Sequence, residues 1–440
     1  MRLGVTELPN PEELVEVGPG AAAEAARHDP YAALRFPDYR WYALGGLFAS
    51  IGSNMQAVAI GWELYDRTGS ALALGWVGLV QAFPVILFAL PAGHLADRFD
   101  RRRLVILGQA LGVLCSLGLT GLSWSNGPVS GFYALLFLGA LARAVYWPAS
   151  LALMPQLVPR AAFSNAVTWK STTFQVASVT GPAVGGFLIA LSGHPAVVYA
   201  STAVLTLVNV GMVAALRARP VARVREPMSM QAVLAGLGFV WRTKAVLAAI
   251  TLDLFAVLLG GATALLPIYA RDVLRVGPAG LGWLRAAPAV GALLMAITLA
   301  HRRPLVRPGR ALLLAVTGFG VVMIVFGISR WFWLSLTVLM VSGALDNISV
   351  VVRHSLVQLS TPDEMRGRVS AVNSVFISCS NELGEFESGF VAAATSPVVS
   401  VVSGGVGTIL VVLVVARCWP EIKELTGLPT RPALSAPATG

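Results

Sequence analysis

Long apolar runs separated by short polar or basic segments form the dominant pattern of this chain. Each run has about 20 residues, the length at which a helix rising 1.5 Å per residue crosses the hydrocarbon of a bilayer. The runs predict twelve membrane-spanning helices, at Trp41–Trp62, Ala73–Ala92, Leu104–Trp124, Phe132–Met154, Ala166–Leu191, Val197–Leu216, Ala245–Tyr269, Leu281–Ala300, Leu312–Ile328, Phe332–Val352, Val369–Ala394 and Val398–Ala416. The expected fold class is therefore all-α and polytopic, and an even number of spans places both termini on one side.

Composition agrees with a membrane protein, because 56% of the 440 residues are hydrophobic and only 12% are charged. The net charge of +10 does not indicate a nucleic-acid partner, since the basic residues punctuate apolar runs and do not cover one face. With the N-terminus inside, the opposite side keeps only Arg67, Arg271, Arg275 and Arg330. Positive charge favours the cytoplasmic side, so both termini are expected there.

The chain divides at changes in polarity. Residues 1–35 are acidic, rich in Ala and without an apolar signal core, and predict a disordered cytoplasmic tail. Residues 36–216 and 245–417 each hold six runs, joined by a basic linker, 217–244, in which Met228–Arg242 predicts an amphipathic helix on the membrane surface. Residues 418–440 predict a second flexible tail.

An internal repeat relates the two six-helix segments. Pro159, Gly181 and Gly186 recur 203 positions later as Pro362, Gly384 and Gly389. The segment Val77–Pro84 likewise echoes Leu281–Pro288. A long-period repeat of this kind predicts two pseudo-symmetric six-helix bundles.

Several ionisable residues fall deep within the predicted spans, where each needs a partner or a water-filled cavity. They are Arg143, Asp253, Arg285, Asp346, Glu382 and Glu385, with Glu387 closer to a helix end. Burial favours a protonated carboxyl group and a nearby Arg favours the charged one, so relative movement of two bundles can switch protonation. We predict a proton and substrate cavity, with Asp253 and Glu385 as the preferred proton sites and Arg143 as a charge partner. The alternative is a set of fixed ion pairs that tie helices together.

The basic segment Gly93–Arg103 joins two spans, and its spacing of Gly93, Asp97-Arg98 and Arg101-Arg102 resembles the signature loop of the major facilitator superfamily. It departs from that pattern at Asp100, where the superfamily usually has Gly. The resemblance implies a conformational latch made of Gly93, Asp97, Arg98, Arg101 and Arg102. Asp97 would face the positive end of a helix starting near Pro362-Asp363-Glu364 and hold the cytoplasmic side closed. The alternative is a basic loop that only sets topology.

The segment Gly181-Pro182-Ala-Val-Gly185-Gly186 resembles the exporter-associated motif of the same superfamily. Pro kinks a helix and Gly lets a neighbouring helix approach, so this segment predicts a gate helix. Ordinary packing of small residues is the alternative.

Three further segments, Asp253–Gly261, Val351–Asn373 and Ser380–Gly389, resemble the enterobactin-exporter branch of this superfamily. The resemblance implies a secondary active transporter that exports a small amphipathic molecule, siderophore or drug-like, by proton antiport with alternating access. The resemblance also implies a location in the bacterial inner membrane. The expected partners are the small-molecule substrate, protons and membrane lipids, and the expected state is a monomer. The alternatives are a proton-coupled importer and a non-transporting membrane sensor or scaffold on the same fold.

An enzyme is not expected, because the sequence has no phosphate-binding loop and no paired zinc ligands, and its five His residues are scattered. The three Cys residues also lack metal-ligand spacing. We therefore expect no metal, no cofactor and no nucleotide as energy source.

Overall fold

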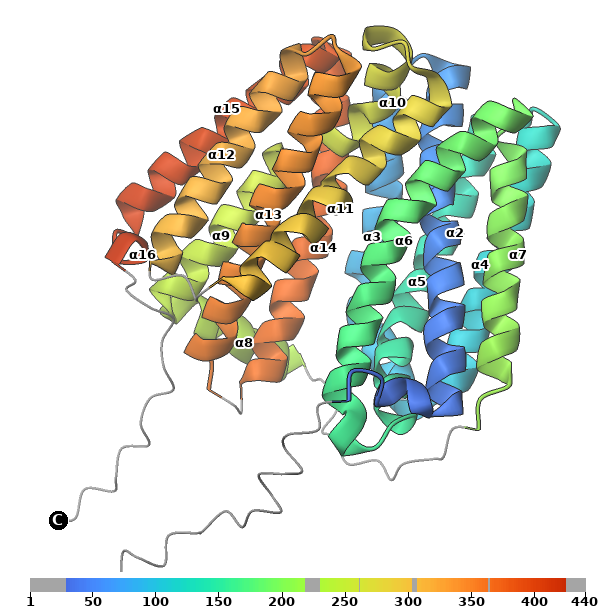
Figure 1. Ribbon diagram of the computed structural model, residues 1–440, viewed down its shortest axis with the longest axis horizontal. Helices are drawn as coiled ribbons and strands as arrows, with labels where there is room; N and C mark the ends of the chain where they lie inside the picture. The colour runs from blue at the N-terminus through green and yellow to red at the C-terminus, as the bar shows by residue number, and fades with distance from the viewer. Residues whose placement is uncertain (1–28, 218–229, 261, 303–306, 363–364, 425–440) are drawn as a thin grey trace, which may run out of the picture.

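The computed structural model describes residues 29–217, 230–260, 262–302, 307–362 and 365–424, and these residues are helical with no strand among them. The first bundle holds six helices, α2 (Pro37–Thr68), α3 (Ala71–Arg98), α4 (Arg101–Trp124), α5 (Val129–Leu153), α6 (Phe163–Ser192) and α7 (Ala196–Ala214). The second holds α9 (Lys244–Leu259), α10 (Leu266–Ile268), α11 (Gly277–His301), α12 (Pro308–Ile328), α13 (Phe332–Ser360), α14 (Arg366–Ala394) and α15 (Pro397–Cys418). Figure 1 shows the two bundles side by side.

Ten helical segments within the described residues are long and apolar enough to cross a membrane. Two more helices, α3 with 28 residues and α14 with 29, pack among them. The prediction of an all-α polytopic fold is confirmed, and the arrangement is consistent with twelve spans. The tails at residues 1–28 and 425–440 lie outside the described residues.

Helix ends follow the local sequence. Helix α2 ends at Gly69 and α6 at Gly193, both in the left-handed conformation that glycine adopts without strain. Helix α4 begins after Asp100, whose carboxylate accepts a hydrogen bond from the backbone N–H of Arg103 at 3.1 Å. Asp100 therefore acts as an N-cap with φ of −62°, and the turn uses no left-handed residue there.

The seventh predicted span is interrupted. Helix α9 ends at Leu259, and the chain continues through the 3-10 turn η5 (Ala262–Leu265), the short α10 and the π turn η6 (Tyr269–Val273). Pro267 lies within this stretch and has no backbone N–H to continue an α-helical ladder. The interruption brings η6 next to the end of α2 at one end of the molecule.

The linker contains α8 (Met230–Arg242), close to the amphipathic helix expected at Met228–Arg242. It packs on α14, where a Cβ on Gly236 would lie 3.0 Å from the backbone oxygen of Arg368. The start expected for the eleventh span, Pro362-Asp363-Glu364, differs from the structure, because α14 begins at Arg366. Asp363 and Glu364 lie outside the described residues.

The two bundles meet mainly at two helix pairs, α3 with α14 and α6 with α11. In one, a Cβ on Gly186 would lie 2.9 Å from the Cα of Gly282. In the other, a Cβ on Gly389 would lie 2.6 Å from the Cα of Gly75. Gly186 and Gly389 are repeat-related, so the same glycine of each half lies at a close crossing with the other half.

Candidate functional site

A cavity of about 490 Å³ occupies the interior of the first bundle and reaches the second bundle at the molecular centre. Small and polar residues on one face of α2 leave room for it, at Gly46, Ser50, Ser53, Ala57 and Gly61. These positions are three or four residues apart, the spacing at which helical side chains share a face. The second bundle contributes residues of α10, α11, α14 and η5.

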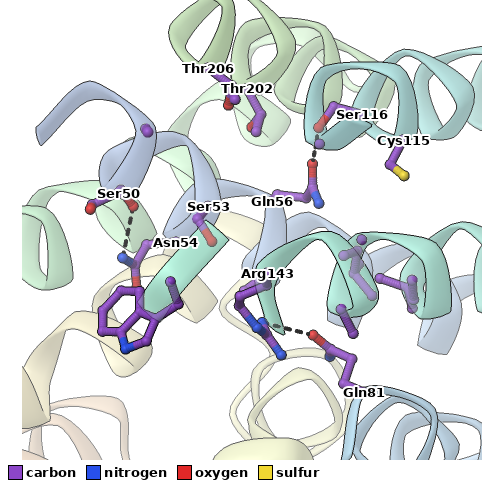
Figure 2. Close-up of a pocket in the computed structure, with 18 of the residues that line it drawn as sticks. Ser50, Ser53, Asn54, Gln56, Gln81, Cys115, Ser116, Arg143, Thr202 and Thr206 are labelled. Carbon is purple, nitrogen blue, oxygen red and sulfur yellow. Dashed lines mark hydrogen bonds between the residues drawn. The ribbon is translucent and has the colours of Figure 1, made fainter. Parts of the chain in front are cut away.

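Arg143 of α5 lies at the centre of this cavity and forms an ion pair with Glu382 of α14 at 3.0 Å. Its guanidinium also donates a hydrogen bond to Oε1 of Gln81 at 3.3 Å, as Figure 2 shows. The Arg143 side chain is 39% exposed and that of Glu382 is 18% exposed. The second carboxylate oxygen of Glu382 is buried and has no hydrogen-bond partner among the described residues. This pair joins the two bundles and leaves one carboxylate oxygen of Glu382 without a hydrogen-bond partner among the described residues.

Arg285 of α11 and Glu385 of α14 also line the cavity, and their opposite charges interact. A close crossing brings Glu385 there, because a Cβ on Gly78 of α3 would lie 2.8 Å from the Cβ of Glu385. Four of the six predicted charges, Arg143, Arg285, Glu382 and Glu385, thus gather at one place. Gln81 was missed in the sequence, since a single Gln in an apolar run carries no distinctive signal.

Asp253 and Asp346 lie elsewhere. Asp253 of α9 forms an ion pair with Arg353 of α13, and both residues are buried within the second bundle. Asp346 is on α13 and lines a second, small cavity together with Asp253. Sequence reasoning missed Arg353 because it ended the tenth span at Val352, whereas α13 continues to Ser360.

A second buried ion pair lies inside the first bundle, and the sequence analysis did not single it out. Glu63 is 3% exposed and pairs with Arg67 one helical turn along α2. Arg67 also donates to the backbone oxygens of Gly127 at 2.9 Å and Ser123 at 3.1 Å, and it lies over the ring of Phe132. The i, i+4 spacing of Glu63 and Arg67 was the available signal.

At the end of the molecule opposite the start of α2, two contacts hold the bundles together. The hydroxyl of Tyr65 donates to the carboxylate of Asp272, and Asp66 pairs with Arg271 at 2.9 Å. The Arg271 guanidinium lies 5.8 Å from the centre of the Tyr65 ring. We call these four residues the far-end clamp, and the opposite end, where α2 begins and α15 ends, the terminal end (Figure 1).

The predicted latch lies at the terminal end. Gly93, Asp97 and Arg98 belong to α3, but their side chains are outside the described residues. Arg101 donates to the backbone oxygen of Ala152 at 3.1 Å, at the end of α5. Arg102 donates to the backbone oxygens of Val213 at 3.1 Å and of Ala214, at the end of α7. These contacts place two cations at helix C-termini within the first bundle.

The predicted gate helix is α6, in which Pro182 lies inside the helix. A Cβ on Gly181 would lie 2.8 Å from the backbone oxygen of Ile51, and one on Gly185 would lie 2.9 Å from the Cα of Met55. These two glycines therefore pack on α2 of the same bundle, whereas Gly186 packs on α11 of the other. One short segment contacts both sides of the bundle interface.

The described residues contain no group of three His, Cys, Asp or Glu side chains able to hold a metal ion. The cavity instead combines cations, carboxylates and neutral amides and hydroxyls, a set that can bind a small polar or charged molecule and exchange protons.

A family model for transmembrane secretion effectors matches residues 28–436. The enterobactin exporter of Escherichia coli O1:K1 is 24% identical over 406 residues, which cover 89% of this chain and 94% of that protein. The enterobactin exporter of Shigella dysenteriae serotype 1 matches with the same identity and coverage.

Solved structures share the fold. A bacterial homologue of the human lysosomal transporter Spinster, in an inward-facing and occupied conformation, has a TM-score of 0.68 at 14% identity and covers 91% of this chain and 99% of that one. A D-xylose–proton symporter has a TM-score of 0.67 at 14% identity and covers 89% of this chain and 99% of that one. The family and its relatives are transporters, in agreement with the expectation that the chain is not an enzyme. The chain belongs to the transmembrane secretion effector family of the major facilitator superfamily.

Proposed function

We propose that this protein exports a small amphipathic molecule, siderophore or drug-like, across the bacterial inner membrane in exchange for protons. The observation that carries the proposal is the Arg143–Glu382 ion pair, which joins the bundles inside the cavity and keeps one carboxylate oxygen without a partner. A group that binds a proton and also holds two moving parts together can couple proton binding to movement.

Protonation of Glu382 removes its negative charge and weakens the pair with Arg143. The Arg143 guanidinium then becomes available to an anionic group of the cargo. Glu385 and Arg285 lie in the same cavity and form a second opposite-charge neighbourhood on the second bundle. Proton and cargo therefore compete for the same side chains, which is the requirement for antiport.

Alternating access follows from the two ends of the molecule. In this structure the far-end clamp joins the bundles, whereas the cavity extends along α2 toward the terminal end as far as Tyr42. We propose that this state loads cargo from the cytoplasm, with both termini on that side. Separation of the clamp would open the cavity to the other side.

The sequence motifs fit into this cycle as proposals. Asp97 and its neighbours would hold the terminal end closed in the opposite state, with Arg101 and Arg102 fixing the loop to α5 and α7. Helix α6 would transmit the movement, because Gly181 and Gly185 contact one bundle and Gly186 the other.

The cargo class rests on the likeness to enterobactin exporters and on the cavity lining. Trp147 and Phe174 line the cavity and provide aromatic surfaces, and Lys170 lies 4.9 Å from the ring centre of Tyr42. Cationic and aromatic groups together suit an anionic aromatic molecule.

The test uses inside-out membrane vesicles energised to acidify the lumen. We expect these vesicles to take up a catecholate siderophore or an amphipathic dye. A protonophore should abolish this uptake, and in the Glu382→Gln protein the uptake should no longer depend on the pH gradient. Glu387→Gln is the matched control, because Glu387 is on the same helix, accepts a hydrogen bond from Ser388 and does not line the cavity.

Accumulation in cells of a deletion strain distinguishes direction. Higher accumulation of the cargo without the gene supports export, whereas lower accumulation would assign import. Transport that is insensitive to the protonophore and to Glu382→Gln would exclude proton antiport through this residue.

A further inference from the structure

Part of the cavity lies inside the first bundle, where α4 and α7 contribute uncharged polar side chains to its lining. Gln109 of α4 and Thr206 and Asn209 of α7 are 8%, 7% and 4% exposed, and all three line the cavity. None of their side chains makes a hydrogen bond to another described residue. Buried polar groups are nearly always paired with protein or water, so three side chains without a protein partner at one cavity wall can bind a ligand that enters it.

Gln56 of α2 completes this wall. Its Oε1 accepts a hydrogen bond from the hydroxyl of Ser116 at 2.8 Å, and Figure 2 shows this pair among the residues that line the cavity. The Gln56 amide nitrogen makes no hydrogen bond within the part of the chain that the structure describes. We call Gln56, Gln109, Thr206 and Asn209 the amide arm.

The arrangement follows from helical spacing. Gln109 and Ser116 are seven residues apart on α4, and Thr206 and Asn209 are three apart on α7, so each pair shares one helix face. Gly45 of α2 leaves space for the Asn209 side-chain oxygen, with which a Cβ there would collide. Three helices therefore direct amides and a hydroxyl into one cavity, whereas apolar packing would have needed none of them.

The chemistry of the arm selects for a particular group. Carboxamides and hydroxyls both donate and accept hydrogen bonds. An apolar group would leave them unpaired, and a group that only accepts would leave their carbonyl oxygens unpaired, each at the cost of desolvation. The cations that line the cavity, Arg143, Lys170 and Arg285, suit an anionic group instead.

We propose that the amide arm is a specificity subsite for an uncharged group of the cargo that both donates and accepts hydrogen bonds, such as an amide. The anionic part of the same molecule lies at Arg143. This inference rests on the proposed function, because it treats the cavity as the cargo site, but it does not depend on proton coupling.

Two matched benzoates test the subsite. 4-Carbamoylbenzoate carries an amide that donates and accepts, whereas 4-(methoxycarbonyl)benzoate carries an ester of similar size that only accepts. We expect purified full-length protein to bind the amide about three- to tenfold more tightly, as one or two hydrogen bonds allow, measured by ligand-dependent thermal unfolding. Gln109→Leu and the isosteric Thr206→Val should each remove most of this preference.

Gln156→Leu is the matched control, because Gln156 does not line the cavity and should leave the preference unchanged. Cys115 also lines the cavity, so it can locate the bound amide. In a Cys379→Ala, Cys418→Ala protein it should react with N-ethylmaleimide more slowly when the amide is present.

Equal affinities for the two benzoates, including no binding of either, would overturn the subsite, as would a preference that survives Gln109→Leu. Proton antiport fails by a different result, namely transport that is insensitive to Glu382→Gln and to a protonophore. A Gln109-dependent amide preference would stand even then, so the two proposals can be refuted separately.

Discussion

Two ion pairs, each between a carboxylate and an arginine, differ in whether they join the two bundles or lie within one of them. Arg143 and Glu382 belong to different bundles and face a cavity of about 490 Å³, with side chains 39% and 18% exposed. Asp253 and Arg353 belong to one bundle, with side chains 9% and 4% exposed. The first pair can separate when the bundles move, whereas the second is fixed by the packing of α9 on α13.

The difference teaches that the location of a charge within a span does not establish its role. A charge pair inside one rigid bundle gives a buried charge its counter-charge, and it stays formed when the two bundles move relative to each other. A pair across an interface changes partners when the interface opens, and it can bind a proton or a ligand in doing so. Three experiments, from the largest expected effect to the smallest, challenge this comparison.

Loss of one partner from the buried pair should have the largest effect on stability. Asp253→Ala leaves the Arg353 guanidinium buried without a counter-charge, and we expect a loss of about 3–5 kcal/mol. Thermal unfolding of the purified protein and its folded yield measure this. The double variant Asp253→Leu, Arg353→Met should recover most of the stability, because apolar residues of similar size remove both charges.

A variant Asp253→Ala of normal stability that has lost transport would contradict this view. Asp253 would then act on a proton or on the cargo, as the sequence analysis expected.

The pair between the bundles should show the reverse pattern. Glu382→Gln removes a partly exposed ion pair, so we expect stability to change by less than about 1 kcal/mol. Transport should nevertheless lose its dependence on pH, because the carboxylate that binds and releases the proton is gone. The pH profile of uptake into vesicles, compared with that of Glu387→Gln, checks this. A large loss of stability with an unchanged pH profile would make this pair structural as well.

Loss of the ion pair in the far-end clamp should have the smallest effect of the three changes. Asp66 and Arg271 join the bundles but are 53% and 39% exposed, so their pair contributes at most about 1 kcal/mol. Arg271→Ala should therefore shift the population toward an open far end by no more than about fivefold. Spin labels at Ser125→Cys and Arg330→Cys, one on each bundle, report the separation. Arg310→Ala, at the terminal end, is the control.

An unchanged distance distribution in the Arg271→Ala protein would show that the Tyr65–Asp272 hydrogen bond and the glycine crossings keep the far end closed without this ion pair.

Much of the architecture could be predicted from the sequence. Apolar runs of bilayer length predict long helices because backbone groups in lipid must be paired within the segment itself. The spacing of Gly186 and Gly389 predicted the repeat, and both glycines lie at the crossings between the bundles. The intramembrane charges were also visible, because such residues are rare in apolar runs.

The partners of these charges were not visible. The pairs Arg143–Glu382 and Asp253–Arg353 depend on how helices distant in sequence pack and rotate about their axes. Likewise, Gln109 and Asn209 look like isolated polar residues in apolar runs until α2, α4 and α7 place them around one cavity.

The sequence by itself determined which segments are helical, how they repeat and which residues bring charge into the membrane, because these follow from local composition and spacing. Only the tertiary structure decided which charges meet, which bundle holds the cavity and which end of the molecule is closed. Those properties depend on contacts between segments far apart in the chain, and no local pattern encodes the register of one helix against another.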